Sequence, residues 1–249
     1  MSRKQLKGDC YMAGLHIDFF GHSAFKITSP KGLKVWIDPW LENPLAPKDA
    51  SINAMREQAD LILITHAHGD HLGNVISMAR SPATEVVAIH EVQQYLLSSG
   101  LPNVTGMNIG GGYSTKGLKI IMTNAVHSSS IQNGNDIIYG GVAAGFVIKF
   151  EDEMAIYHAG DTALFGDISL IGQLYRPKIA MLPIGGHYVM GPKEAAHAAQ
   201  LTGADIIMPM HYGTFPVLTG TVAAFQKEAD AMGLKANILP LAPGEGSDF

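Results

Sequence analysis

The chemically richest part of this chain is a run of titratable side chains, His66, His68, Asp70 and His71, directly after the apolar residues 61–64. The run places three imidazoles and one carboxylate within six residues. Imidazole nitrogens and carboxylate oxygens are the ligands that borderline divalent transition metals prefer. The apolar stretch predicts a buried strand, and a strand that ends in such a run brings these groups to one edge of a sheet. The sequence therefore predicts a metal site at that edge.

Three further candidate ligands, His127, Asp161 and His211, each follow the end of a later predicted strand. Loops that follow the carboxyl ends of adjacent strands converge in space. We therefore expect these side chains to join the first run. Together they form a set large enough for two metal ions, with one carboxylate shared between the ions.

Such a pair of ions predicts hydrolysis. Two divalent cations that share a water lower its pKa towards neutrality, and the resulting bridging hydroxide is a nucleophile at physiological pH. One cation also polarises the oxygen of an ester, lactone, amide or phosphate, so no covalent enzyme intermediate is needed. Asp70 and Asp161 would offset the charge of the cations and orient the hydroxide, which makes Asp70 a catalytic candidate as well as a ligand.

Other titratable residues are candidates for supporting roles. His187 lies in a glycine-rich loop after a predicted strand and is either a substrate contact or general acid for the leaving group, or a structural residue. Asp38 can accept a ring N–H from a metal-binding histidine, or simply occupy a turn before Pro39. His22 can line the same edge or hydrogen-bond within a hairpin.

The elements that must position these residues follow from turn signals and periodicity. Strands come first and then alternate with helices, and this order occurs twice along the chain. The pattern predicts an α/β (α+β) architecture in which two mixed sheets pack face to face with helices outside. Predicted strands cover residues 15–20, 24–28, 33–37, 61–64, 85–89, 103–109, 115–125, 142–150, 154–157, 179–184, 206–209 and 237–241, and predicted helices cover residues 54–59, 74–79, 91–98, 192–201 and 221–232.

Composition narrows the functional classes. The 249 residues carry a formal net charge of −5 with neutral histidines, which disfavours a nucleic-acid surface because that would need clustered Lys and Arg. The single cysteine, Cys10, cannot form an intramolecular disulfide, and this favours a reducing, cytoplasmic location. No stretch is long and apolar enough to span a bilayer, so no membrane partner is expected. Residues 1–13 are predicted to be a disordered leader to one domain, residues 14–249.

The chain resembles the metallo-β-lactamase superfamily. The resemblance rests on the H-x-H-x-D-H pattern of residues 66–71, the later His127, the segment 160–162 and the late His211. Four more segments resemble an uncharacterised metal-dependent hydrolase branch that is related to the bacterial L-ascorbate-6-phosphate lactonases. These are residues 21–25, 37–40, 183–187 and 211–216.

The resemblance implies a four-layer αββα sandwich with the metal centre at one edge. It assigns three ligands to each of two divalent ions and a bridging position to Asp161. Zinc is the first expectation, with manganese, iron, nickel or cobalt as alternatives. The first ion would take His66, His68 and His127, and the second would take Asp70, His71 and His211.

The resulting hypothesis is a dinuclear metal-dependent hydrolase that acts on a small, anionic metabolite such as a lactone, ester or phosphoester. The alternatives are a phosphodiesterase or nuclease of the same superfamily, an iron-dependent redox protein, and a non-catalytic metal-binding protein. A homo-oligomer is expected because the lactonase relatives form larger assemblies. The loops 40–51, 128–136 and 188–191 are expected to select the substrate.

Overall fold

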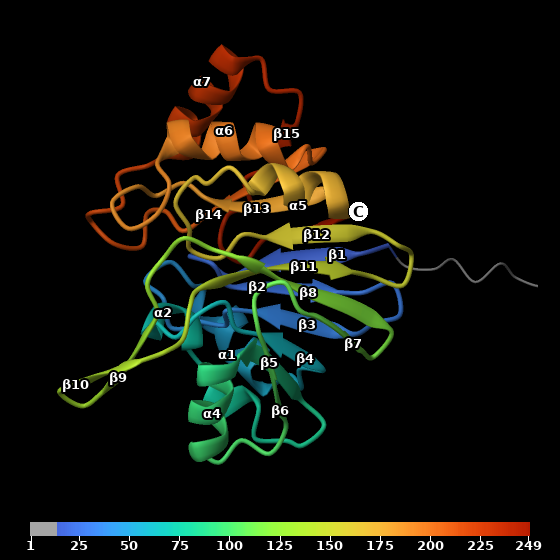
Figure 1. The fold of residues 1–249 in the computed structure, drawn as a ribbon, viewed down its shortest axis with the longest axis vertical. Coiled ribbons are helices and arrows are strands. Elements are labelled where there is room, and N and C mark those ends of the chain that lie inside the picture. Colours follow the sequence, from blue (N-terminus) through green and yellow to red (C-terminus); the bar gives the residue numbers. More distant parts are fainter. Residues whose placement is uncertain (1–13) are drawn as a thin grey trace, which may run out of the picture.

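The computed structural model describes residues 14–249 and contains two seven-stranded sheets that pack against each other (Figure 1). Helices cover the outer face of each sheet, so the order of layers is helix, sheet, sheet, helix. The predicted fold of two mixed sheets between helices is confirmed. The leader expected at residues 1–13 lies outside the described part of the chain.

The first sheet is antiparallel on one side and parallel on the other. β1, β2 and β3 pair antiparallel, whereas β3, β4, β5 and β6 pair parallel, and β16 adds an antiparallel edge strand next to β1. The strand order is β16-β1-β2-β3-β4-β5-β6. The strands are β1 (His16–Phe19), β2 (Phe25–Thr28), β3 (Lys34–Ile37), β4 (Leu61–Leu63), β5 (Glu85–Ile89), β6 (Val104–Met107) and β16 (Gly246–Asp248).

The second sheet repeats this pattern, as the order of the predicted elements indicates. β7, β8, β11 and β12 pair antiparallel, and β12, β13, β14 and β15 pair parallel. A separate hairpin of β9 (Ser130–Asn133) and β10 (Asp136–Tyr139) projects from the body (Figure 1). The sheet strands are β7 (Gly112–Thr115), β8 (Leu118–Asn124), β11 (Ala144–Lys149), β12 (Ala155–His158), β13 (Ile179–Pro183), β14 (Ile206–Met210) and β15 (Asn237–Ile238).

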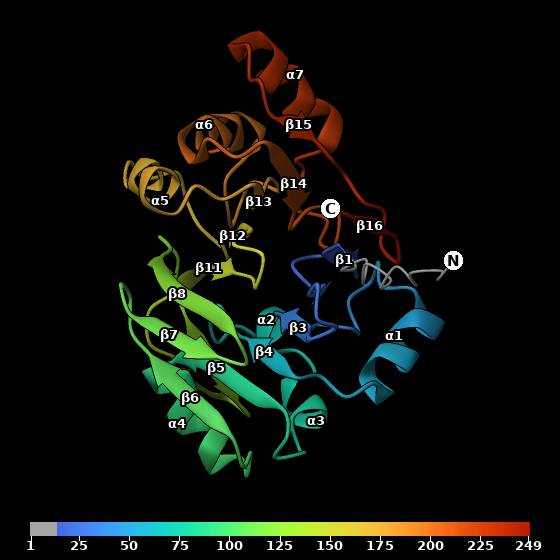
Figure 2. The same cartoon turned by 90° about the vertical axis from the view of Figure 1, so that its right-hand side faces the viewer.

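The helices connect the parallel strands of each sheet, as crossover connections require. Figure 2 shows α5, α6 and α7 over the second sheet, with α1, α3 and α4 on the far side of the first. Within residues 14–249, no helix combines the length and apolar character that crossing a bilayer demands. The helices are α1 (Lys48–Arg56), α2 (Gly69–Leu72), α3 (Val75–Met78), α4 (His90–Ser98), α5 (Ile168–Tyr175), α6 (Pro192–Thr202) and α7 (Val222–Met232).

Strand β13 shows how the layers are held together. Its side chains alternate between the two faces, as the pleat of a strand dictates. Ile179 and Met181 join the hydrophobic cluster between the sheets, whereas Ala180 and Leu182 join the cluster beneath α5, α6 and α7. Both faces are therefore apolar and dry, and the polar groups of the parallel strands gather at their ends.

Helix α5 was not predicted, because Gly172 interrupts its apolar pattern. The glycine serves a close approach to α6. A Cβ atom at Gly172 would lie 2.7 Å from the carbonyl oxygen of Leu201, closer than real carbon–oxygen contacts allow. The predicted strand at residues 115–125 is also corrected. Lys116 and Gly117 both have positive φ angles and turn the chain there, which makes a hairpin of β7 and β8.

Replacing Gly172 with alanine should lower the free energy of unfolding by about 1–3 kcal/mol, because the added methyl group forces α5 and α6 apart. Urea denaturation measures this change. Gly166→Ala is the matched control, since an added Cβ there meets nothing within 4 Å of the described atoms. Equal stability of the two variants would contradict the packing argument.

Candidate metal centre

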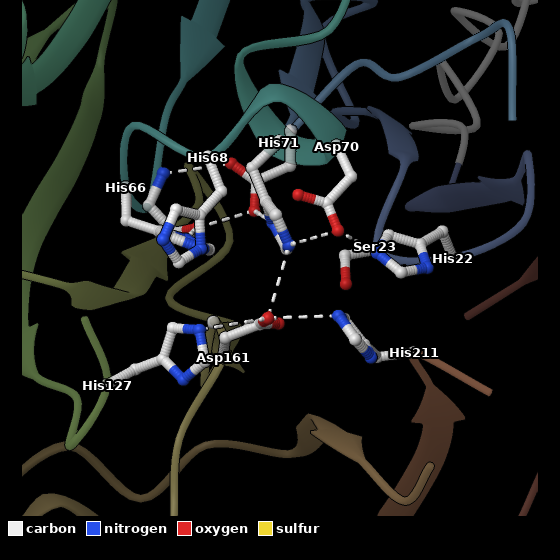
Figure 3. A network of polar contacts seen from close by, with 12 residues as sticks. His22, Ser23, His66, His68, Asp70, His71, His127, Asp161 and His211 are labelled. Atoms are coloured by element: carbon white, nitrogen blue, oxygen red, sulfur yellow. Dashed lines mark hydrogen bonds and ion pairs between the residues drawn. The ribbon is translucent and has the colours of Figure 1, made fainter. Parts of the chain in front are cut away.

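The polar run of residues 66–71 lies where β4 ends and the short helix α2 begins. His66 and His68 occupy the loop between these elements. The backbone N–H groups of His71 and Leu72 donate to the carbonyl of His68, at 3.0 and 2.9 Å, and so close the first turn of α2. This turn carries Asp70 and His71 to the same edge of the sheet as the two preceding histidines (Figure 3).

One group of potential ligands consists of His66, His68 and His127, and each offers a nitrogen within 4.8 Å of the others. Nε2 of His66 lies 2.9 Å from Nδ1 of His68. His127 reaches them from the loop after β8. The backbone N–H of Val126, next to His127, donates to Oγ1 of Thr162 at 3.0 Å, which ties this loop to the segment that carries Asp161.

A second group brings together His22, Asp70, His71 and His211, again with ligand atoms within 4.8 Å of one another. Nε2 of His22 lies 3.1 Å from Oδ2 of Asp70, and the rings of His22 and His211 have centroids 3.9 Å apart. The backbone also links these two residues, because the N–H of His211 donates to the carbonyl of His22 at 2.7 Å and so joins the two sheets at this point. Six of the seven predicted ligands lie in these two groups and His22 is an addition, while a third, overlapping group joins His66 and His71 to Asp161.

Asp161 lies between the two groups (Figure 3). Its Oδ2 atom is 2.9 Å from Nε2 of His211, 3.3 Å from Nε2 of His71 and 3.6 Å from Nε2 of His127. A carboxylate that contacts imidazoles of both groups occupies the position that a bridging ligand needs.

The sequence left the role of His22 undecided between the site edge and a hairpin hydrogen bond. The structure buries His22 completely and places its Nδ1 2.6 Å from Oγ1 of Thr214. Gly21 and His22 both have positive φ, which marks a tight turn between β1 and β2 that aims the imidazole into the site. The adjoining glycine is the signal that could have found it.

Asp38 fixes the orientation of histidines in both groups. Its Oδ2 atom lies 2.7 Å from Nδ1 of His71 and accepts the hydroxyl proton of Thr65 at 2.6 Å. Since the Thr65 hydroxyl donates to Asp38, it must accept from Nδ1–H of His66, 3.0 Å away. Nε2 of His66 then carries an unprotonated lone pair, whereas Nε2 of His71 faces Oδ2 of Asp161 at 3.3 Å. The ring hydrogen bond predicted for Asp38 is present.

The charges of the site follow from burial and from its carboxylates. Burial is the largest influence on the pKa of His66, His68 and His127 and lowers it in each case; for His22 it lowers the pKa to about 4. Burial also acts on His71, but the carboxylates of Asp161 and Asp38 outweigh it and raise its pKa well above the ordinary value. Four of these five histidines are therefore neutral near pH 7, the form of imidazole that binds a metal.

Several buried atoms of the site have no hydrogen-bond partner among the described residues. They include Nε2 of His71, both ring nitrogens of His211 and Oδ1 of Asp161. Buried polar atoms are normally paired, because an unpaired one costs free energy. A divalent cation would satisfy these lone pairs, so the donor set fits the metal that the residue types suggest.

A cavity of about 700 Å³ opens onto this cluster. Each of the three predicted substrate loops contributes one lining residue, and the segment after His211 contributes three more. His187 is exposed and stacks edge-on against Tyr188, and it is Tyr188 that lines the cavity. The role predicted for His187 stays a prediction. The cavity is lined by Trp40, His68, Gly69, Asp70, His127, Ser128, Asp161, Tyr188, His211, Phe215, Pro216 and Val217.

Comparison with known proteins identifies the family to which this chain belongs. Residues 34–212 match the family described as "Beta-lactamase superfamily domain". A UPF0173 metal-dependent hydrolase of Rubrobacter xylanophilus is 45% identical over 238 residues, which cover 94% of this chain and 96% of the relative. A second one, from Methanopyrus kandleri, is 42% identical and covers 93% of this chain and 98% of the relative.

Solved structures show the same fold. The metallo hydrolase Igni18 of the archaeon Ignicoccus hospitalis has a TM-score of 0.82 and 37% identity, over 94% of this chain and 98% of its own. An isothiocyanate hydrolase from Delia radicum gut bacteria has a TM-score of 0.71 at 20% identity, over 94% and 98% of the two chains. The second likeness is one of fold alone.

We expect His22 to make the stability of the metal-free protein depend on pH. Its pKa is about 4 in the folded protein and about 6.5 in the unfolded chain, so the unfolded chain binds more protons between these values. The free energy of unfolding therefore falls as the pH is lowered through this window. Between pH 7.5 and pH 5 the loss due to His22 should be about 2 kcal/mol.

Urea denaturation of the chelator-treated protein and of His22→Asn at both pH values measures this effect. Titrating groups remote from His22 are common to both proteins and cancel in the difference, so the difference reports His22 together with its partner Asp70. The wild type should lose more stability on acidification than the variant. Equal losses would show that His22 is not held neutral by burial.

Proposed function

Since this chain belongs to the β-lactamase superfamily and is a metal-dependent hydrolase, we propose that it uses two divalent metal ions to hydrolyse a small molecule. The observation that carries the proposal is that the ligand atoms fall into two groups, which a third group of His66, His71 and Asp161 joins. A single ion would need only one of these groups.

The proposed ligands of the first ion are His66, His68 and His127. Those of the second are Asp70, His71 and His211, and Asp161 serves both. His22 belongs to the second group by its position, as a further ligand or as the partner that holds Asp70. Nitrogen and oxygen donors of this kind accept zinc first, and also manganese, iron, nickel or cobalt.

The chemistry that two such cations supply is the activation of water and the polarisation of a substrate oxygen. The protein provides the conditions for it. The carboxylates of Asp70 and Asp161 offset the cationic charge, and burial keeps their neutral histidine neighbours in the ligating form. Asp38 holds the rings of His71 and, through Thr65, of His66 in one orientation. The cavity admits a substrate to the open side of the cluster, where the carboxylate of Asp70 is available to orient the attacking water.

The described residues give the nuclease and phosphodiesterase alternative little support. None of the residues that line the cavity is Lys or Arg, and binding to a phosphate backbone depends on such groups. A relation to the L-ascorbate-6-phosphate lactonases stays a hypothesis, as do the cytoplasmic location, the homo-oligomer and a general-acid role for His187.

Asp161→Ala should reduce the metal content from two ions per chain to one or none, because both groups lose their shared carboxylate. Hydrolysis of a 4-nitrophenyl ester should fall by about 100-fold or more. Elemental analysis of the dialysed protein and the release of nitrophenol check the two effects. Asp167→Ala is the control, since Asp167 is exposed and lies outside the cluster. Full metal content together with full activity in Asp161→Ala would overturn the proposal.

Asp38→Asn should weaken metal binding by about 10- to 100-fold, because the ring of His71 loses the charged acceptor that fixes its orientation. Competition with a fluorescent zinc chelator measures the affinity. Asp60→Asn is the matched control. Its carboxylate also accepts a backbone N–H, from Lys34 at 2.8 Å, but has no contact with the cluster. The same affinity in both variants would show that Asp38 does not support the ligands.

A further inference from the structure

The cavity beside the cluster has two chemically different walls. One is formed by the candidate ligands His68, Asp70, His127, Asp161 and His211. The other is built almost wholly of aromatic and aliphatic side chains, and among the described residues it includes no Lys or Arg. We call this second set the apolar wall; it consists of Trp40, Tyr188, Phe215, Pro216 and Val217.

The apolar wall is held in place by the metal-site residues themselves. The rings of Trp40 and Phe215 stack with centroids 5.7 Å apart and an interplanar angle of 24°. Each also meets the ring of His22 edge-on, at 5.0 Å for Trp40 and 5.6 Å for Phe215. Because His22 is fully buried in the cluster, the aromatic pair has a set distance from the place where a reacting bond would lie.

The rim of the apolar wall is exposed to solvent. Tyr188 is 56% and Val217 is 42% exposed, and both border the cavity. Covering such surface with an apolar ligand is favourable, because it removes apolar area from water. Binding sites for small molecules typically combine an apolar lining of this kind with a few polar groups that fix orientation.

Charge excludes one class of ligand. An anionic group placed away from the cluster would lie against the apolar wall without a cationic partner, and an unpaired charge is costly to desolvate. The charged groups that line the cavity, Asp70 and Asp161, belong to the ligand cluster, and the apolar wall offers an anion no charged partner. The small anionic metabolite expected from sequence alone therefore does not match the lining.

We propose that the substrate is a neutral carboxylic ester or lactone whose aromatic or alkyl group packs on the apolar wall. This inference rests on the proposed function. In the reaction the oxygen of water forms a bond to the carbonyl carbon and the acyl C–O bond breaks. One proton of water passes to the departing alcohol oxygen, so that an acid and an alcohol result. Specificity then comes from Trp40, Phe215 and Val217, and not from a cationic anchor.

Two esters of the same chain length that differ in one terminal group test the substrate class on the metal-loaded protein. They are 4-nitrophenyl pentanoate and mono-4-nitrophenyl glutarate, in which a terminal carboxylate replaces the terminal methyl group. We expect kcat/KM to be at least about tenfold higher for the neutral ester, because the carboxylate has no partner on the apolar wall. Equal or faster hydrolysis of the glutarate ester would overturn the inference.

A lysine at the rim should reduce this preference. Val217→Lys should reduce the ratio of the two kcat/KM values by about tenfold, since it supplies the missing cation. Val142→Lys is the matched control, because Val142 is similarly exposed, at 45%, but does not line the cavity. Metal content is measured for both variants and should equal that of the wild type. The same ratio in both variants would show that the apolar wall does not contact the substrate.

Binding to the apolar wall can also be measured without turnover, because Trp40 is one of two tryptophans and the other, Trp36, is fully buried. The neutral ketone 4-phenylbutan-2-one should change the fluorescence of the wild type and not of Trp40→Phe. Its analogue with a carboxylate on the ring, 4-(3-oxobutyl)benzoate, should bind about tenfold more weakly. Tighter binding of the charged ketone would overturn the inference.

Ester hydrolysis and the fluorescence titration together distinguish a failure of the proposed function from a failure of the proposed substrate class. If neither ester is hydrolysed and the protein retains no metal, the proposed function fails, while the fluorescence titration still decides whether the cavity takes a neutral ligand. If both esters are hydrolysed at equal rates by a protein with two ions, the function stands and the substrate class is wrong.

Discussion

The structure depends on one requirement at the edge where the two sheets meet. Titratable side chains that are packed closely together there must find partners for their charges and lone pairs. Imidazoles and carboxylates contact one another there, and the buried ones, among them His66, His71 and Asp161, need partners because water does not reach them. At the centre, the carboxylate of Asp161 contacts His71, His127 and His211. Asp38 fixes the orientation of His71 through the other ring nitrogen, Nδ1. Groups without a described partner remain, and they are nitrogen and oxygen donors that a divalent cation would satisfy.

The repeated arrangement of the two sheets creates this edge. Each sheet has an antiparallel part followed by a parallel part, so the polar ends of parallel strands from both sheets lie together. Backbone hydrogen bonds join the sheets there, from Ala144 to Thr65 at 3.0 Å and from His211 to His22 at 2.7 Å. His22, Asp38 and His211 adopt positive φ angles, a conformation that costs free energy in non-glycine residues and that is typical of functional sites. The same packing that closes the core therefore aims the ligands.

The cavity adds a second chemical property to this edge. Its ligands are polar and acidic, but the surface opposite them is aromatic and carries no cation among the described lining residues. The aromatic pair Trp40 and Phe215 packs on His22, so one buried imidazole supports both the metal-binding side and the substrate side. A hydrolytic centre arranged in this way suits a substrate with a polar reacting bond and an apolar body.

Much of the fold and of the candidate ligand set could be predicted from the sequence, because strand periodicity and ligand type are local properties. The order of strands and helices was sufficient to predict two mixed sheets. The apolar residues before His66, with the ligand types that follow them, were sufficient to predict a metal site at the end of a strand. Helix α5 was not predicted, because the sequence does not distinguish a glycine such as Gly172, which permits close helix packing, from a glycine that ends a helix. The place of His22 in the cluster and the formation of the apolar wall depend on the tertiary structure alone. His22 contacts Asp70 and Thr214, which are 48 and 192 residues away along the chain, and such contacts follow from how the sheets pack and not from any local pattern.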